Sequence, residues 1–367
     1  MPDKNKILHL VPADCDWESA LRIAGLAAAL REHGFTSAIT SPDHSRLWEF
    51  AEAAGVENIA YSLEPSYNPL RWLELSKLIK QSDAAIVHLH EPEAARMFSH
   101  ANRFLPKLVA VSSRYNLRTQ PTAVECGGGI DAVVCSSAFL ADSFHRLGAT
   151  QKVSVIFDGI PSPMAERAVE ERDRLRIQLR DAYCPDKEKP LFVVNMAPLE
   201  EDSGQADILE AMAEIIAVLP QTHLVIMGEG ALREELYRQI RIMALEKDVV
   251  IIEPDKAFVR ILAAADVYVS ASKNDVSGVM IQAAMMTGRA TALVESGCHS
   301  ELAEDGKTAI FAHGAGALPL RDAILELLEN RTRREHIGRL AKARALKEFD
   351  MTETAKKTAE IYGKLTE

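Results

Sequence analysis

Short runs of apolar residues alternate along the chain with longer amphipathic stretches. In the first part of the chain, the apolar runs cover residues 6–12, 36–40, 58–63, 84–90, 107–113, 131–137 and 152–158. Some of them, such as residues 132–135, are apolar at consecutive positions, which is typical of a strand covered by helices on both faces. Strands separated by segments of helix length indicate βα units and a mostly parallel sheet.

The pattern breaks near Pro161 and Pro163, and a charge-dense amphipathic helix is expected over residues 164–183. A second series of apolar runs follows at residues 191–197, 222–228, 249–253, 266–272, 290–295 and 308–312, before polar helices from about 318 to 365. The fold class predicted is α/β, with two Rossmann-like, doubly wound parallel-sheet domains facing each other across a cleft. We expect the domains at 1–162 and 163–350, with a helix at 351–367 that packs back on the first domain. No short-period repeat indicates a solenoid.

Length and composition agree with two folded domains. The chain has 367 residues, of which 47% are hydrophobic and 26% charged, as in an ordinary folded protein. Its net charge of −11 argues against a protein that binds nucleic acid through the phosphates. The five cysteines are odd in number and include no CxxC pair, so neither a disulfide framework nor a zinc cluster is indicated.

The sequence also bears on location. The first residues are polar and do not resemble a secretory signal, and no apolar run approaches the ~20 residues that span a bilayer. We therefore expect a cytoplasmic protein without a transmembrane segment. Residues 70–80 and 96–107 combine basic and apolar side chains, which favours amphipathic helices packed on the sheet. The alternative is a weak peripheral contact with the inner face of a membrane.

Polar residues gather where the predicted strands end. In open α/β sheets, ligands bind beyond the carboxyl ends of the strands. The clusters there are His88 and His90, Ser112 and Ser113, Ser136 and Ser137, Asp158 and Gly159, 228–230, and 272–275. Strand ends are polar in any α/β protein, so plain solvation is the alternative interpretation for each cluster.

Several phrases, in this order, together resemble one family. They are residues 86–90 (IVHLH), 131–136 (DAVVCS), 155–160 (VIFDGI), 224–230 (LVIMGEG), 263–269 (AAADVYV) and 278–288. Over essentially the whole chain, the sequence is similar to the retaining glycosyltransferases of the GT-B fold, of the family 4 (group 1) type. The resemblance implies a UDP- or GDP-sugar donor in the second domain, a glycan or lipid-linked acceptor in the first, and neither metal nor cofactor. It also implies front-face departure of the nucleotide, with positive groups stabilising the leaving diphosphate.

The resemblance assigns roles to particular residues. His90 aligns with a family histidine near the donor sugar, and Asp275 falls on the first of two family glutamates, so these two are the catalytic candidates. A histidine hydrogen-bonded within the core is the alternative for His90. Lys273 offers a replacement charge, or else is a solvated surface lysine. The donor-binding candidates are Ser203, Gly204, Gly228, Glu229, Gly230, Ser272, Lys273, Ser277, Gly278 and Val279.

The donor site departs from the family pattern. Pro198 and Ser203 stand where the family has an arginine and a lysine that grip the diphosphate, and Ala283 stands where the second glutamate holds the ribose. Gln282 is one position away and would point elsewhere on a helix. The nearby acidic run 200–202 would repel a diphosphate unless it turns outward. The bulky segment 13–18 replaces a Gly-Gly loop, and Ser113 replaces a further histidine.

Three functions remain open. The first is a glycosyltransferase with a degenerate donor site, which makes an envelope glycan or glycoconjugate with retention. The second is a catalytically silent relative that keeps the fold to bind a nucleotide, a sugar or a partner, which the missing cations favour. The third is a nucleotide-sugar epimerase, for which the sequence offers chiefly His90 and Asp275.

Overall fold

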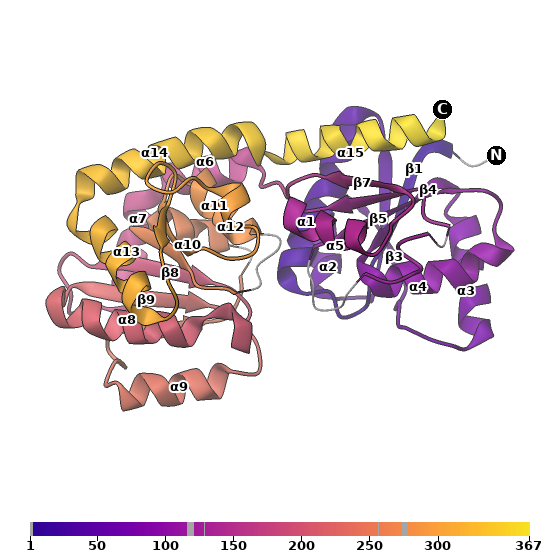
Figure 1. Ribbon diagram of the computed structural model, residues 1–367. Coiled ribbons are helices and arrows are strands. Elements are labelled where there is room, and N and C mark those ends of the chain that lie inside the picture. The colour runs from indigo at the N-terminus through magenta and orange to yellow at the C-terminus, as the bar shows by residue number, and fades with distance from the viewer. Residues whose placement is uncertain (1–2, 116–120, 128, 256, 274–277) are drawn as a thin grey trace. The chain divides into compact units, whose positions relative to one another are not determined.

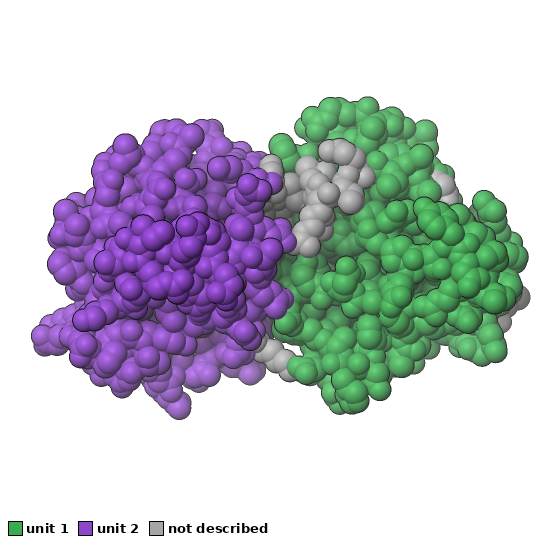
Figure 2. Space-filling view, turned by 90° about the horizontal axis from the view of Figure 1, so that it is seen from below, with its two compact units in different colours: residues 1–159, 351–367 green, residues 160–350 purple. Residues whose placement is uncertain are grey.

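The chain folds into two compact units. The computed structural model describes residues 3–115, 121–127, 129–255, 257–273 and 278–367. The first unit comprises residues 1–159 and 351–367, and the second comprises residues 160–350 (Figure 2). Each is an α/β unit built on a parallel sheet, as the sequence pattern predicted.

The sheet of the first unit has seven described strands in the order β3-β2-β1-β4-β5-β6-β7, and all of their pairings are parallel. Each of the seven apolar runs of the first half overlaps one strand. The strands are β1 (Asp3–Leu10), β2 (Thr36–Ser41), β3 (Glu57–Ala60), β4 (Ala84–His90), β5 (Val109–Arg114), β6 (Ala132–Cys135) and β7 (Lys152–Val155).

Four helices of the first unit, α1, α2, α3 and α5, begin at a residue whose side chain caps the helix. Asp16 accepts a hydrogen bond from the backbone N–H of Ser19 at 2.8 Å, and Ser137 accepts one from Leu140 at 3.2 Å. The helices are α1 (Trp17–Ala29), α2 (Arg46–Ala53), α3 (Pro69–Gln81), α4 (Glu91–Ala101), α5 (Ala138–Arg146) and α15 (Met351–Thr366), with 3₁₀ turns η1 (Leu30–His33) and η2 (Asn102–Phe104).

The last helix completes the core of the first unit. Apolar side chains of α15, including Met351, Ala355 and Ile361, are buried with Ile7 of β1 and Ile86 of β4. The helix packs against α1, η1 and β5 and is the yellow helix next to this sheet in Figure 1. The chain therefore leaves the first unit after β7 and returns to it for its final residues.

The second unit has a six-stranded parallel sheet in the order β10-β9-β8-β11-β12-β13. Each apolar run of the second series contains one of these strands. They are β8 (Leu191–Met196), β9 (Thr222–Met227), β10 (Val249–Ile252), β11 (Val267–Ser270), β12 (Ala290–Val294) and β13 (Ile310–Ala312).

Helices cover this sheet as well. The helix expected over 164–183 is broken at Glu171 into two, α6 (Ser162–Glu170) and α7 (Arg172–Tyr183). Asp266 anchors α7, since its carboxylate accepts from Arg176 at 2.8 Å and from the backbone of Phe192 at 2.9 Å. The remaining helices are η3 (Glu201–Ser203), α8 (Gln205–Val218), α9 (Arg233–Ile242), α10 (Phe258–Ala264), α11 (Val279–Met286), α12 (His299–Leu302), α13 (Ala317–Glu329) and α14 (Arg331–Glu348).

The strand orders locate the places where ligands can bind. In each sheet the order reverses once, between β1 and β4 in the first unit and between β8 and β11 in the second. At such a reversal the loops leave the strands in opposite directions and open a crevice beyond the carboxyl ends. Among the described residues, no helix is long and apolar enough to cross a membrane.

Candidate functional site

A cradle of backbone forms at the reversal point of the second unit. Gly204 lies after β8, caps the start of α8 and has a φ of 75°, a left-handed conformation that glycine adopts without steric cost. A Cβ atom at this position would lie 2.3 Å from the carbonyl oxygen of Ala271, which follows β11. The loops after β8 and β11 are thus in direct backbone contact, and only glycine fits at Gly204.

Two further glycines line the same edge of the sheet. A Cβ at Gly228 would lie 2.2 Å from the carbonyl oxygen of Ala197, and a Cβ at Gly230 would lie 2.5 Å from that of Leu199. The backbone N–H of Leu199 donates to Glu229 at 2.9 Å, which joins the loop after β8 to the loop after β9. We call Gly204, Gly228 and Gly230 the glycine cradle.

The other predicted donor residues are distributed around this edge. Ser203 is buried next to Gly204, and Gly278 and Val279 form the start of α11. The carbonyl oxygen of Ser272 accepts a hydrogen bond from Ser296 at 2.7 Å. Asp275 and Ser277 lie outside the described residues.

The charges at this edge are mostly acidic. Glu200, Glu201 and Asp202 are all exposed to solvent. The backbone N–H of Lys273 donates to the carbonyl of Asp202 at 2.9 Å. The side chain of Lys273 is largely exposed, and its ammonium group lies 3.9 Å from the carboxylate of Asp207 on α8. The charge that could replace the family's missing cations is therefore partly offset by this carboxylate.

Gln282 lies on α11 within the apolar core. Its side chain is completely buried, and neither its amide oxygen nor its amide nitrogen has a hydrogen-bond partner among the residues that the structure describes. An unsatisfied buried amide is costly to the folded state. Ala283, at the position of the family's second glutamate, is also buried.

His90 lies at the end of β4 in the first unit and has no exposed surface. Its Nε2 is 2.9 Å from Nδ1 of His9, and its Nδ1 is 3.1 Å from the hydroxyl of Tyr115. Both ring nitrogens are therefore engaged within the first unit. Burial, followed by the charges of neighbouring groups, lowers the pKa of His90 well below its usual value.

The hydrogen bonds around His90 extend to other buried side chains. His9 also contacts Ser37 of β2, with 3.2 Å between Nε2 and Oγ. His88 contacts Ser113 through Nε2 at 2.7 Å and Tyr362 of α15 through Nδ1 at 2.5 Å. Burial lowers the pKa of His9 to about 3 and that of His88 well below its usual range, so all three histidines are neutral near pH 7.

The sequence interpretation missed His9 and Tyr362. His9 lies within an apolar strand, and Tyr362 lies on an ordinary amphipathic helix, so neither carried a local signal. The pairing of β1 with β4 brings His9 to His88 and His90, and the packing of α15 brings Tyr362 to His88. Ser113 was noted in place of a family histidine, and the structure places it against His88.

A small polar cavity lies beside these residues in the first unit. It has a volume of about 20 Å³ and is lined by Ser113, Tyr115, Arg22 and Asp158, together with apolar and threonine side chains. The guanidinium of Arg22 is 4.5 Å from the ring centre of Tyr115 and 3.7 Å from the carboxylate of Asp158. Trp17, in the segment that replaces the Gly-Gly loop, is buried at the start of α1.

Glu91 directly follows His90 and has an unusual backbone conformation. Its φ of 68° is in the left-handed region, which is strained for a residue with a side chain. Burial raises the pKa of its carboxyl group to about 7, and Arg114 and Arg22 oppose that rise. Strained backbone of this kind is often found at functional sites.

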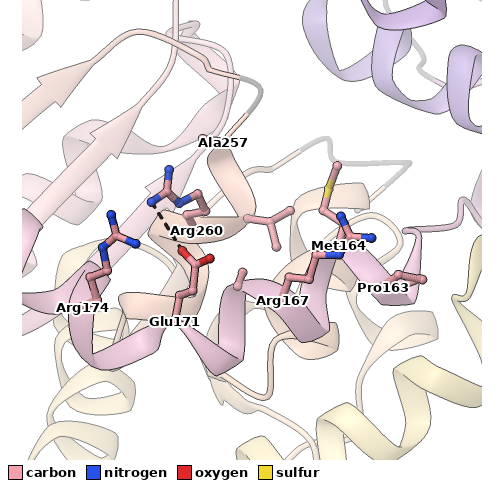
Figure 3. Close-up of a pocket in the computed structure, with 9 residues that line it drawn as sticks. Pro163, Met164, Arg167, Glu171, Arg174, Ala257 and Arg260 are labelled. Atoms are coloured by element: carbon pink, nitrogen blue, oxygen red, sulfur yellow. Dashed lines mark ion pairs between the residues drawn. The ribbon is translucent and has the colours of Figure 1, made fainter. Parts of the chain in front are cut away.

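A groove of about 520 Å³ lies on the second unit beside α6, α7 and the start of α10 (Figure 3). Arg167, Arg174 and Arg260 line it with Glu171, which lies 3.6 Å from Arg260. Three arginines against one glutamate make this surface positive in a chain whose net charge is −11. The sequence interpretation did not identify it, because its arginines come from separate helices.

The two parallel-sheet units define a protein of the GT-B fold. Structures of similar architecture include the Anabaena protein Alr3699/HepE in complex with UDP and glucose, with 18% identity, coverage of 97% of this chain and 99% of that one, and a TM-score of 0.81. A glycosyltransferase from Rickettsia africae has 16% identity, 99% coverage of both chains and a TM-score of 0.81. Sucrose-phosphate synthase from Thermosynechococcus elongatus has 16% identity, coverage of 98% and 99%, and a TM-score of 0.77. At these identities the likeness shows the fold alone.

The second unit also carries a sequence match. Residues 183–344 match the family described as Glycosyl transferases group 1. This range contains the glycine cradle and all of the predicted donor-binding residues. The match and the fold together support a GT-B glycosyltransferase. No curated protein matches the sequence.

Proposed function

We propose that this protein is a retaining glycosyltransferase that moves a sugar from a UDP- or GDP-sugar to an envelope glycan or glycoconjugate. The observation that carries the proposal is the glycine cradle, where three positions without room for a Cβ lie within the range that matches the group 1 family. These glycines let the loops after β8, β9 and β11 pack closely together at the edge of the sheet where a diphosphate would bind. The complexes of the Anabaena protein with UDP and glucose, and of the pneumococcal O-GlcNAc transferase GtfA with UDP and GlcNAc, support a nucleotide-sugar donor.

In this proposal, the donor diphosphate lies against the glycine cradle and the start of α11. The partial positive charge of a helix N-terminus favours a phosphate group there. Lys273 supplies a side-chain cation to the leaving diphosphate once it turns away from Asp207. The bond between the sugar and the leaving phosphate oxygen breaks, and this oxygen takes the proton of the acceptor hydroxyl. The acceptor oxygen forms its bond to the sugar on the same face. Asp275 remains the catalytic candidate of the second unit for a contact with the sugar.

One observation favours a second candidate, a silent relative that binds a nucleotide, a sugar or a partner without transferring. The only cation predicted at the donor edge, Lys273, is 3.9 Å from Asp207, and Pro198 and Ser203 replace the two gripping cations of the family pattern. Removing one donor to transition-state charge typically slows a reaction by about 10² to 10³-fold. Binding with slow or absent transfer is the behaviour expected of this candidate.

Calorimetric titration with UDP and GDP, followed by incubation with UDP- and GDP-sugars, separates the two candidates. Binding and slow release of free sugar from the donor support the transferase. Binding without any sugar release supports the silent relative, and no binding of either nucleotide contradicts the transferase. Lys273→Ala should weaken binding about tenfold by loss of a charge-assisted contact. The control Lys307→Ala, another exposed lysine beside a carboxylate, should not change it.

We also propose that the protein works in the cytoplasm and contacts the inner face of the membrane weakly. Leu70, Leu73, Lys77 and Lys80 are exposed on one face of α3, and Phe104 is exposed on η2, which packs against α3. Apolar and basic side chains on one helix face suit an anionic bilayer surface. Flotation with vesicles containing anionic lipid should recover the protein at low salt. Equal recovery of the variant Leu70→Ser/Leu73→Ser would contradict this contact.

A further inference from the structure

Three buried histidines meet at the reversal point of the first sheet. His9 lies on β1, and His88 and His90 lie on β4, where His9 is the register partner of His88. His88 and His90 are two residues apart on a strand, so their side chains are on the same face. None of the three has exposed surface. The three imidazoles therefore form one buried cluster.

The rings present nitrogen atoms to one another. One ring nitrogen of each histidine lies within 4.8 Å of one from each of the other two. The shortest separation is 2.9 Å, between Nδ1 of His9 and Nε2 of His90. Imidazole nitrogens at such separations are an arrangement that one metal ion can bridge, and three histidines form the protein part of some zinc sites.

Each ring is also held from outside the cluster by a hydroxyl. Ser37 contacts Nε2 of His9 at 3.2 Å, Tyr115 contacts Nδ1 of His90 at 3.1 Å, and Tyr362 contacts Nδ1 of His88 at 2.5 Å. Metal-binding histidines almost always donate their second ring N–H to such a partner, which sets the tautomer and the ring orientation. With the ring protons on these outer nitrogens, His9 Nδ1 and His90 Nε2 keep their lone pairs on the side where the two rings meet, and His88 Nε2 keeps its lone pair on the side of Ser113.

We propose that His9, His88 and His90 form a binding site for one Zn²⁺ ion. Imidazole nitrogen is a ligand that Zn²⁺ prefers, and the ligand must be neutral. For an ion to bind, the proton shared by His9 Nδ1 and His90 Nε2 has to move to an outer ring nitrogen, such as Nε2 of His9 opposite Ser37.

The surroundings can complete the coordination. The hydroxyl of Ser113 lies 2.7 Å from Nε2 of His88, and the adjacent cavity of about 20 Å³ has room for a water molecule. Zn–N bonds of about 2.0–2.1 Å at tetrahedral angles need nitrogens about 3.3 Å apart. The separation between His9 and His90 must therefore widen by a few tenths of an ångström. The positive charge of Arg22 near this cavity is balanced by Asp158 at 3.7 Å.

The site would be structural. It has no exposed ligand, and it joins β1 to β4 and, through Tyr362, to α15. Without an ion, the same rings are satisfied by the hydrogen bonds described above, so the unit folds in either state. An ion that binds only the folded unit must raise its melting temperature.

The test uses the full chain, stripped of metal by a chelator. We expect equilibrium dialysis with Zn²⁺ to give one tightly bound ion per chain and an increase in the melting temperature followed by tryptophan fluorescence. This probe reports the first unit, because Trp17, Trp48 and Trp72 all belong to it. His9→Gln and His88→Gln should each weaken binding by at least about tenfold. His223→Gln, which changes a buried histidine of the second unit, should leave it unchanged.

Failure to bind Zn²⁺, or binding that is equal in the wild type and in His9→Gln, overturns the proposal. X-ray absorption of the zinc-loaded wild type gives a second test that does not depend on the folding of a variant. It should show three imidazole nitrogens at about 2.0–2.1 Å. Sulfur in the shell would assign the ion to a cysteine instead and would equally overturn the proposal.

Discussion

The hydroxyl of Tyr362 lies 2.5 Å from Nδ1 of His88, although 274 positions separate the two residues in the sequence. Tyr362 is on the last helix, and His88 is on a central strand of the first sheet. Both side chains are fully buried, and their rings meet edge to face with 5.8 Å between centres. This contact ties the final helix to the centre of the first unit.

Tyr362→Phe removes this hydrogen bond while it keeps the ring. We expect the free energy of unfolding of the first unit to fall by about 1–3 kcal/mol, because a buried ring nitrogen of His88 loses its partner. Urea unfolding followed by tryptophan fluorescence measures this change. Tyr67→Phe is the matched control, since Tyr67 is 87% exposed. An equal effect of the two variants would show that the buried contact contributes nothing.

Gly204→Ala tests the glycine cradle. The new Cβ would meet the carbonyl oxygen of Ala271 at 2.3 Å, in addition to the strain of a φ of 75°. Gly306→Ala shares the strain, with a φ of 68°, but has no atom within 4 Å of the new Cβ. We expect Gly204→Ala to destabilise the second unit by about 1–3 kcal/mol more than Gly306→Ala, as overpacking does, and to abolish UDP or GDP binding. Retained nucleotide affinity in a folded Gly204→Ala protein would contradict the cradle.

Gln282→Met replaces an unpartnered buried amide by an apolar side chain of similar size. Because no hydrogen bond is lost, we expect the second unit to become more stable by about 1 kcal/mol or more. Gln205 is also buried, but its amide donates to the carbonyl of Pro198 at 3.0 Å. Gln205→Met should therefore be destabilising. Thermal unfolding followed by far-UV circular dichroism checks the two opposite signs, and destabilisation by Gln282→Met would show that its amide has a partner.

The stability of the second unit should fall in mild acid because of His223. Burial and the charge of Lys187, opposed by Asp248, together lower the pKa of His223 to about 4. A histidine in the unfolded chain has a pKa of about 6.5. Between this pH and pH 4, the unfolded state therefore binds a proton at His223 that the folded state does not. The stability that neutral His223 contributes is thus fully present above pH 6.5. It is lost on acidification, and the free energy of unfolding falls by up to about 1.4 kcal/mol per pH unit.

His223→Leu removes this contribution. The difference in unfolding free energy between wild type and variant should change with that slope between pH 6.5 and pH 4 and stay constant above it. The other histidines are the same in both proteins, so their contributions cancel. A difference that does not depend on pH would show that folding does not shift the pKa of His223.

The sequence pattern predicted most of the secondary structure for a local reason. A strand covered on both faces must be apolar over several residues, and residues 84–90 are both the predicted run and the observed strand β4. The prediction of a single helix over 164–183 was wrong in one respect. It breaks at Glu171, where the backbone leaves the helical conformation although the amphipathic pattern continues.

The cluster at the end of β4 was only partly visible in the sequence. His88 and His90 drew attention because they end an apolar run. His9 did not, because a single histidine between apolar neighbours in a strand gives no sign of its partner. Its contact with His90, 81 positions away, depends on the strand order, which places β1 next to β4.

By itself the sequence determined the two series of strands, the capped helices and the polar strand ends, since these follow from the period of apolar residues and from capping chemistry within a few positions. The tertiary structure alone decided which side chains meet. The neutral state of the three histidines, the contact of Tyr362 with His88 and the backbone contact of Gly204 with Ala271 all require long-range strand pairing and burial. A linear pattern shows which face of an element is buried, but not which residues lie opposite it.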